Sequence, residues 1–312
     1  MVPASRTRQE AAAQGPCSPP VVNAFTVDVE DYYMVSAFEG SVRFEEWDRY
    51  ESRVEKNTRR ILETLDRYGV KGTFFVLGWI AERCRGLVRD IGAAGHEVAC
   101  HGYRHRLIYT MTPEEFREDL RRAKGILEEC SGAAVSGYRA ASYSIVRETL
   151  WALDILIEER FRYDSSIFPI HHDRYGIPGG ERFAHRIERA GGSIVEIPPS
   201  TISLFGRNIP VAGGGYLRLF PLEVTRAALK SISRREGKPA VVYLHPWEID
   251  PRQPRIRCRL KSRLRHYVNL KSTAAKVEAL LREFPFGPIA ALLGPFTENR
   301  CNGEDARRGK RA

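Results

Sequence analysis

The stretch HEVACHGYRH, residues 96–105, decides how this chain is interpreted. A short apolar run ends at Cys100, and two histidines, His101 and His105, follow it four residues apart. If the backbone makes one helical turn after the strand, both imidazoles lie on the same face and can reach one metal ion. Gly102 allows the chain to turn sharply between them. The pair therefore predicts metal ligands at a strand end, although ordinary surface histidines show the same spacing.

Strand-like and helix-like segments alternate on both sides of this stretch. Short apolar runs read as buried strands, and segments with apolar residues at helical spacing lie between them. Such alternation is typical of an α/β fold with a mainly parallel sheet. We expect strands at residues 21–27, 72–77, 97–100, 134–138, 161–163, 194–198, 211–220 and 240–244. We expect helices at 51–68, 87–94, 112–130, 147–160, 222–235 and 272–284, and a long loop or small hairpin at 171–186.

Chemically active side chains follow several of these strands. Parallel strands gather their C-terminal ends on one face, so these side chains are expected to share a pocket. Two imidazoles and a carboxylate with an open coordination position can activate water through a metal ion. A second carboxylate can take the proton of that water, and a further histidine can protonate a leaving group. The strand-end residues are Asp28, Glu30, His101, His105, Arg139, His245 and, as a further contribution, Asp164.

Length and composition restrict the fold class and the partners. With 312 residues and 43% hydrophobic content, the chain can form one large core. Six scattered cysteines without a C-x-x-C pair indicate reduced thiols. The net charge of +10 suggests an anionic partner, but no stacking aromatics accompany it, so nucleic acid is not expected. The basic segment 252–265 predicts peripheral contact with a membrane or an anionic glycan.

The chain ends predict little regular structure. Residues 1–20 are rich in Ala, Pro, Gln and Ser and are expected to be disordered, as is the basic tail 297–312. No run of about 18 apolar residues is present, and the N-terminus lacks the apolar centre of a secretory signal. We therefore expect a cytoplasmic protein without a transmembrane segment.

Six motifs in one order resemble a known family. The chain is similar to the polysaccharide deacetylases, which are NodB-type carbohydrate esterases. Within them it resembles the branch found in bacterial exopolysaccharide loci linked to the exosortase system. The resemblance spans residues 22–286, and residues 263–270 also resemble that branch. The motifs are TVDVED (26–31), GTFFV (72–76), HGYRH (101–105), GYRAASY (137–143), YDSS (163–166) and LHPWE (244–248).

The resemblance implies a distorted (β/α) barrel of about seven strands that forms a single domain over residues 21–296. A branch-specific region is expected at about 250–290. It also implies a divalent metal, usually Zn²⁺, and hydrolysis of N-acetyl groups on a sugar polymer or its precursor in exopolysaccharide biosynthesis. By resemblance, Asp28 is the general base, Arg139 orients it, and His245 is the general acid. Glu30, His101 and His105 are the metal ligands.

The chain departs from the commonest pattern of the family at three positions. Asp28-Val29-Glu30 stands where many members have two adjacent aspartates, so Asp31 competes with Glu30 as the ligand. Alternation favours Glu30, because residues 28 and 30 point to the same side of an extended strand. The residues after Arg139 leave open whether Ser142 or Tyr143 supplies the backbone N–H for an oxyanion.

The third departure is that no aspartate is clearly placed to tune His245. Asp164 is the candidate for this role. Trp247 and Tyr143 are candidates for the wall of a sugar subsite, and a packed core role is equally compatible with both residues.

Two other functions stay open. One is a metal-independent hydrolase that cleaves a C–N bond in a small cyclic amide or ureide. The other is a non-catalytic glycan-binding protein, although such a protein has no need of Asp28, His101, His105 and His245 together. The sequence does not specify the glycan, the native metal or the oligomeric state.

Overall fold

The computed structural model describes residues 20–297 of the chain. Within this range no helix combines the length and hydropathy that a bilayer crossing would require. The disorder expected for residues 1–20 and 297–312 falls almost wholly on 1–19 and 298–312, which lie outside the described residues. Four cysteines in the described range are free thiols, as expected from their spacing.

One central sheet organises the described chain. Its path runs β10–β1–β2–β3–β4–β5–β7, with parallel pairing throughout, and β6 pairs antiparallel with β7 at the edge. The parallel path is consistent with the predicted distorted barrel of about seven strands. The strands are β1 (Asn23–Val29), β2 (Thr73–Val76), β3 (Glu97–Cys100), β4 (Gly137–Tyr138), β5 (Tyr163–Asp164), β6 (His185–Arg189), β7 (Gly192–Glu196) and β10 (Val241–Leu244). A short β11 (Phe286–Gly287) joins β1, and β8 (Thr201–Leu204) and β9 (Arg207–Pro210) form a separate hairpin.

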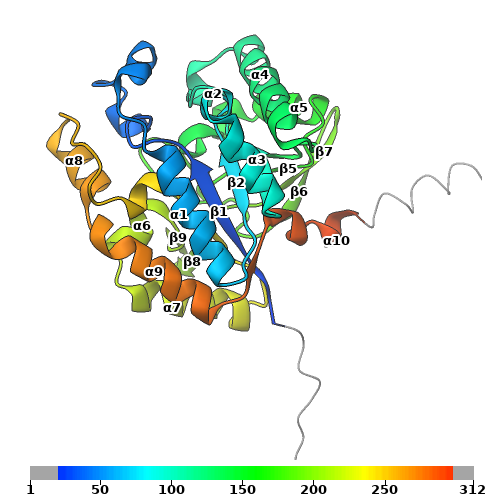
Figure 1. Cartoon of the computed structure of the whole chain (residues 1–312). Helices are drawn as coiled ribbons and strands as arrows, with labels where there is room; N and C mark the ends of the chain where they lie inside the picture. Colours follow the sequence, from blue (N-terminus) through cyan, green and yellow to red (C-terminus); the bar gives the residue numbers. More distant parts are fainter. Residues whose placement is uncertain (1–19, 298–312) are drawn as a thin grey trace, which may run out of the picture.

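Helices surround this sheet, as Figure 1 shows for the layer in front of β1 and β2. They are α1 (Val54–Arg67), α2 (Gly78–Arg83), α3 (Arg85–Ala93), α4 (Pro113–Ser131), α5 (Trp151–Glu158), α6 (Gly214–Leu219), α7 (Leu222–Lys230), α8 (Leu260–Tyr267), α9 (Leu270–Glu283) and α10 (Gly294–Thr297). The predicted capping box at the start of α4 is present. Thr112 Oγ1 accepts from the Glu115 N–H at 3.2 Å, and the Glu115 carboxylate accepts from the Thr112 N–H at 2.9 Å.

Strand β1 is buried along its whole length, which explains its almost continuous apolar sequence. Its alternate residues separate two environments. Phe25, Val27 and Val29 pack in the large hydrophobic cluster that includes residues of the surrounding helices, whereas Ala24 packs in a second cluster with Phe75 of β2. Asp28 is an even-numbered residue of the same strand, so it shares the side of Ala24. The alternation along β1 therefore directs this carboxylate to the face of the sheet that carries the second cluster, away from the large cluster.

Two local details differ from the sequence analysis. The single helical turn considered between His101 and His105 is absent, and the reversal after β3 is a loop with positive φ angles at Gly102 (75°) and His105 (55°). Residues 211–220 do not form a strand, because Gly214–Leu219 is α6. The ring of Tyr243 lies directly on this turn, and a Cβ at Gly213 would be 2.1 Å from its Cδ1 atom. Only glycine tolerates such a close approach.

Candidate metal centre and active site

The C-terminal ends of the parallel strands open into one cavity of about 380 Å³. Asp28 lies near the end of β1, Glu30 follows it, and His101 and His245 directly follow β3 and β10. The sequence thus correctly predicted that these distant segments meet. Eight of the predicted site residues line the cavity: Asp28, Glu30, His101, His105, Ser142, Tyr143, His245 and Trp247.

Three of these side chains are arranged as metal ligands. One donor atom each from Glu30, His101 and His105 lies within 4.8 Å of the other two, and all three residues are buried. His105 Nε2 is 2.8 Å from Glu30 Oε2, yet this buried oxygen has no hydrogen-bond partner of suitable geometry among the described residues. Two imidazoles and one carboxylate are the donor set of many catalytic zinc sites. The residues present therefore fit a divalent metal.

Hydrogen bonds with neighbouring groups orient two of the ligands, His101 and Glu30. His101 Nδ1 donates to the Arg139 carbonyl at 2.8 Å, which leaves Nε2 free for an ion. Trp247 Nε1 donates to Glu30 Oε1 at 3.2 Å. Trp247 therefore holds a ligand as well as lining the cavity, a role that its sequence position did not predict.

Asp31, the alternative ligand, is used elsewhere. Its Oδ2 atom accepts the N–H groups of Arg53 (2.7 Å) and Val54 (3.0 Å) at the start of α1, and the hydroxyl of Ser52 (2.9 Å). This contact set fixes the carboxylate to a helix N-terminus. The geometry favours Glu30 as the ligand, in agreement with the alternation argument.

The titration of two triad members, His101 and Glu30, suits metal binding, whereas Glu30 raises the pKa of the third, His105, against the effect of burial, so a metal ion would have to displace a proton there. Burial lowers the pKa of His101 to about 4, so its imidazole is neutral at physiological pH. Burial opposes the ionisation of Glu30, but His105 and the other nearby histidines outweigh it and lower the pKa of Glu30 to about 2. A neutral imidazole and an ionised carboxylate are the forms that coordinate a metal.

Asp28 is held by the buried arginine that the motif predicted. Arg139 Nη1 donates to Asp28 Oδ1 at 2.6 Å and to Thr26 Oγ1 at 2.8 Å. Its other nitrogens donate to the Ser165 carbonyl and hydroxyl. Since the guanidinium is fully buried and fixed on both sides, it holds the Asp28 carboxylate in one orientation.

His245 approaches Asp28 Oδ2, the oxygen that Arg139 does not contact. It belongs to a row of charged side chains, Arg218, Glu248 and His245, which we call the charge chain. Its Nε2 atom is 3.8 Å from Asp28 Oδ2 and 3.5 Å from Glu30 Oε1. Its Nδ1 atom is 2.9 Å from Glu248 Oε2, and Arg218 Nε donates to Glu248 Oε1 at 2.6 Å. Burial opposes protonation, but Glu248, with Glu30 and Asp28, raises the pKa of His245 to about 9.

The carboxylate that contacts His245 is therefore Glu248 and not Asp164. Asp164 Oδ1 accepts from the Ser166 hydroxyl at 2.5 Å, and the residue pairs in register with Glu196 of the neighbouring strand. Burial raises the pKa of Asp164 to about 6 and that of Glu196 well above its usual range. Asp164 Oδ2 and Glu196 Oε2 are both buried, and the charge of Asp164 adds to burial in disfavouring the ionisation of Glu196.

The sequence did not lead us to predict two residues of the charge chain, Glu248 and Arg218. Glu248 stands three residues after His245 in a 3₁₀ turn (Pro246–Ile249), a spacing that brings the side chains together and could have identified it. Arg218 lies in the segment expected to be a strand, so no local pattern placed it near the site.

Glu248→Gln is expected to shift the alkaline limb of the kcat/KM profile to lower pH, by about one unit. His245 must be protonated to act as an acid, so activity is lost as pH rises through its pKa. Removing the negative charge of Glu248 weakens the imidazolium, and the loss then occurs at lower pH. Hydrolysis rates measured across pH check this. Asp250→Asn, which loses a carboxylate that pairs with Arg53 instead, should leave the limb unchanged; an unshifted limb in Glu248→Gln would contradict the assignment.

Ser142 and Tyr143 lie in a strained turn at the cavity wall, with φ angles of 50° and 55°. The Tyr143 N–H already donates to the Ala140 carbonyl at 3.1 Å, so of the two the Ser142 N–H is the better candidate for an oxyanion. The Tyr143 ring packs edge-on against Tyr243 and Phe168, which makes it a rigid part of the wall.

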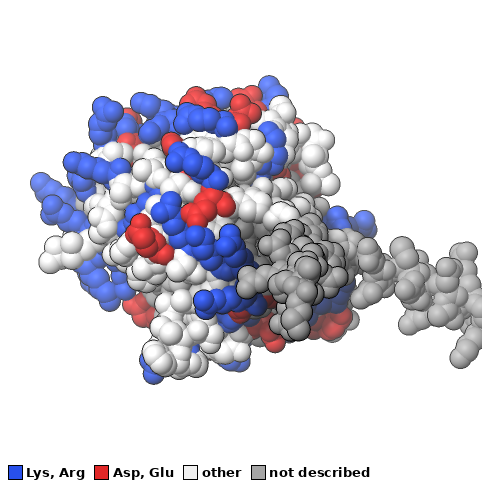
Figure 2. Space-filling model, turned by 90° about the horizontal axis from the view of Figure 1, so that it is seen from below, with Lys and Arg blue, Asp and Glu red and all other residues white. Residues whose placement is uncertain are grey.

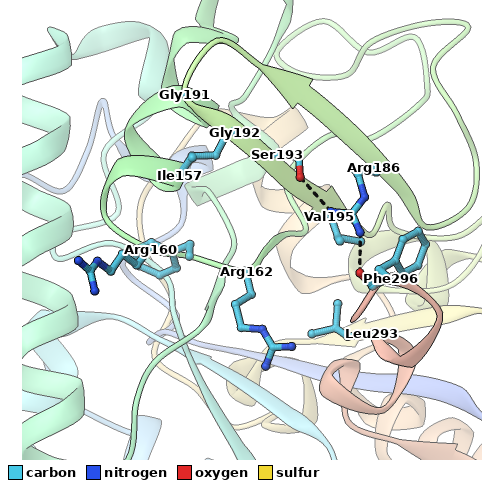
Figure 3. A pocket seen from close by; sticks show the side chains of 11 residues that line it. Ile157, Arg160, Arg162, Arg186, Gly191, Gly192, Ser193, Val195, Leu293 and Phe296 are labelled. Carbon is cyan, nitrogen blue, oxygen red and sulfur yellow. Dashed lines mark hydrogen bonds between the residues drawn. The ribbon is translucent and has the colours of Figure 1, made fainter. Parts of the chain in front are cut away.

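A larger cavity of about 560 Å³ lies away from these residues, between α5, β7 and α10. It contains Arg160, Arg162 and Arg186, but their guanidinium groups do not converge on one point (Figure 3). Arg186 donates to Ser193 Oγ and to the Phe296 carbonyl instead. None of the predicted site residues borders this cavity, so it is not the candidate active site.

Comparison with known proteins agrees with the motifs. A family model described as "Polysaccharide deacetylase" matches residues 44–155. A peptidoglycan-N-acetylglucosamine deacetylase of Bacillus cereus is 32% identical over 98 residues, which cover 31% of this chain and 36% of the relative. A peptidoglycan deacetylase of Helicobacter pylori is 29% identical over 114 residues, covering 36% and 37%. Over the matched regions the chain is similar to polysaccharide deacetylases. The chain spans about a third of the length of these relatives.

Residues 165–294 match a second family model, described as "Domain of unknown function (DUF3473)". A crystal structure from Mycobacterium smegmatis, assigned to the polysaccharide deacetylases, has a TM-score of 0.60 at 22% identity and covers 93% of this chain and 96% of that one. This likeness concerns the fold. The two matched regions share one sheet, and the site draws His101 and His105 from the first and His245 from the second.

Proposed function

We propose that this protein is a metal-dependent hydrolase that removes N-acetyl groups from an N-acetylated glycan. The observation that carries the proposal is the convergence of the Glu30, His101 and His105 triad with Asp28 and His245 in one cavity. The deacetylase names of the relatives support the choice of an amide bond on a sugar. The proposal includes a divalent metal, and the two nitrogens and one oxygen offered by the triad favour Zn²⁺.

Glu30, His101 and His105 would hold a divalent ion, whose chemistry when bound would be that of a Lewis acid toward the acetyl carbonyl and water. Asp28 takes the proton from the attacking water, because Arg139 holds its carboxylate toward the cavity. Ser142 lines the cavity, and its N–H is proposed to donate to the oxyanion of the tetrahedral intermediate. His245 then protonates the sugar nitrogen as the C–N bond breaks, and acetate and the free amine leave.

Opposed charge environments support these two proton-transfer roles. Glu248 raises the pKa of His245, which suits a general acid, whereas Asp28 is paired with a guanidinium that fixes the orientation of its carboxylate, which suits a base. Trp247 and Tyr143 bound the space beside His245 and are proposed to contact the sugar.

Metal removal provides the test. We expect the protein to release acetate from an N-acetylated oligosaccharide, a chelator to abolish the release, and added Zn²⁺ or another divalent ion to restore it. Acetate is measured directly, and the free amine that forms in equal amount is measured as the second product. Amide or ureide hydrolysis unaffected by chelator would favour the metal-independent alternative. Glycan binding without acetate release under any divalent metal would favour the non-catalytic one.

We further propose that the protein acts in exopolysaccharide biosynthesis, belongs to the exosortase-linked branch and is located in the cytoplasm. Residues 250–290 are proposed to be specific to that branch, and the basic segment 252–265 to contact a membrane or an anionic glycan. Because the Glu30, His101 and His105 triad borders a cavity of about 380 Å³, the N-acetyl group of any glycan substrate must enter that cavity.

A further inference from the structure

We propose that α8 and the segment leading into it form a docking surface for an anionic membrane, next to the mouth of the active-site cavity. The first observation is a pair of exposed leucines. Leu260 and Leu264 are 70% and 63% exposed, and their i,i+4 spacing places them on one outward face of α8. This helix lies at the left edge of the molecule in Figure 1, on the other side from α10.

Basic side chains flank these leucines. Residues 251–267 contain seven arginines and lysines and no acidic residue. Among them, Lys261 and Arg263 follow Leu260 on either side of the apolar face and are exposed. A short helix with apolar residues on one face and cations beside them is typical of interfacial membrane binding.

The exposed leucines favour a membrane over a soluble anionic glycan. Lysine and arginine side chains also cover much of the face that Figure 2 shows, so positive charge alone does not single out α8. A glycan offers hydroxyl and acid groups that would leave Leu260 and Leu264 in water. A bilayer with acidic lipids offers partners for both the cations and the leucines.

The C-terminal end of α8 is fixed to the active site. The His266 ring stacks on Trp247 at a centroid distance of 4.1 Å, and Arg218 Nη1 donates to the carbonyls of Arg265 and His266. Arg265 and His266 also line the catalytic cavity. The helix thus presents its leucines from a fixed position beside the cavity mouth.

Docking through α8 would hold the cavity mouth close to the bilayer. Together with the proposed function, on which this step rests, it makes a membrane-attached N-acetylated glycan the substrate class. The docking itself needs no substrate, so it can be tested independently of acetate release.

The test is vesicle co-sedimentation of the full chain. We expect binding to phosphatidylcholine vesicles containing about one third phosphatidylglycerol, and weaker binding to pure phosphatidylcholine or at high salt. Leu260→Ser/Leu264→Ser should weaken binding at least about tenfold, because both side chains lose their apolar contact. Lys261→Gln/Arg263→Gln should weaken it about fivefold for each charge removed. All four residues are exposed, so the thermal melts should match that of the parent protein.

A matched control is Leu204→Ser/Phe205→Ser, which removes exposed apolar side chains (49% and 96%) from the β8–β9 hairpin. This variant should bind vesicles like the parent. Vesicle binding unchanged in the Leu260/Leu264 variant would overturn the proposal, as would no binding by the parent protein. Binding to a soluble anionic polysaccharide that is unaffected by the leucine substitutions, without vesicle binding, would assign the surface to a glycan instead.

Discussion

Asp28→Asn is expected to lower kcat for acetate release on the order of a thousandfold, the contribution of a positioned general base. The amide has the size of the carboxylate and can still accept from Arg139, but it cannot take a proton from water. Asp28 is buried, 2.6 Å from Arg139 Nη1 and 3.8 Å from His245 Nε2, and it is not a member of the ligand triad. The variant should therefore keep its bound metal while losing activity.

The measurement is acetate release combined with metal content. Loss of the buried ion pair also lowers stability, so the assay must be run well below the melting temperature of the variant. Asp154→Asn is the matched control, because it removes an aspartate paired with Arg189 on the surface. Retention of more than about a tenth of the activity would remove Asp28 from the role of base.

His101→Ala is expected to weaken metal binding by more than about a hundredfold, since loss of an outer-shell partner alone costs 10–100-fold. His101 supplies one of three donor groups, and its backbone-bonded Nδ1 atom leaves a single nitrogen to coordinate. Zinc affinity, measured by competition with a chromophoric chelator, reports this without reference to activity. Acetate release should fall in parallel at limiting metal.

The matched control is His185→Ala, because His185 bonds to the Phe183 carbonyl and does not border the cavity. Unchanged zinc affinity and stoichiometry in His101→Ala would refute the triad. An effect of the same size in the control would attribute the loss to general destabilisation.

The site was predictable where local periodicity determined which way a side chain points. Alternation along β1 distinguished Glu30 from Asp31, and the ends of buried strands located His101 and His245. The capping box of α4 was equally local, because its two partners are three residues apart. In such cases the geometry depends on the backbone of a single element.

The wrong predictions involve contacts between distant segments. The glycines before α6 adapt to the ring of Tyr243, a residue some thirty positions away, and no pattern within 211–220 reveals this. Asp164 follows a strand as a tuning carboxylate should, but the side chain of Glu196 on the next strand engages it instead. The spacing of His101 and His105 predicted that the two side chains lie close together. They do, but a loop with two positive φ angles brings them together, not a helical turn.

Asp31 links the candidate metal site to helix α1. Its carboxylate closes the first turn of α1, and the preceding residue, Glu30, is a candidate ligand. A displacement of this helix would be transmitted to the ligand through a single peptide unit. We therefore expect metal binding and the docking of α1 to be thermodynamically linked. Zinc should slow hydrogen exchange at the Arg53 and Val54 amides, although neither residue belongs to the candidate triad.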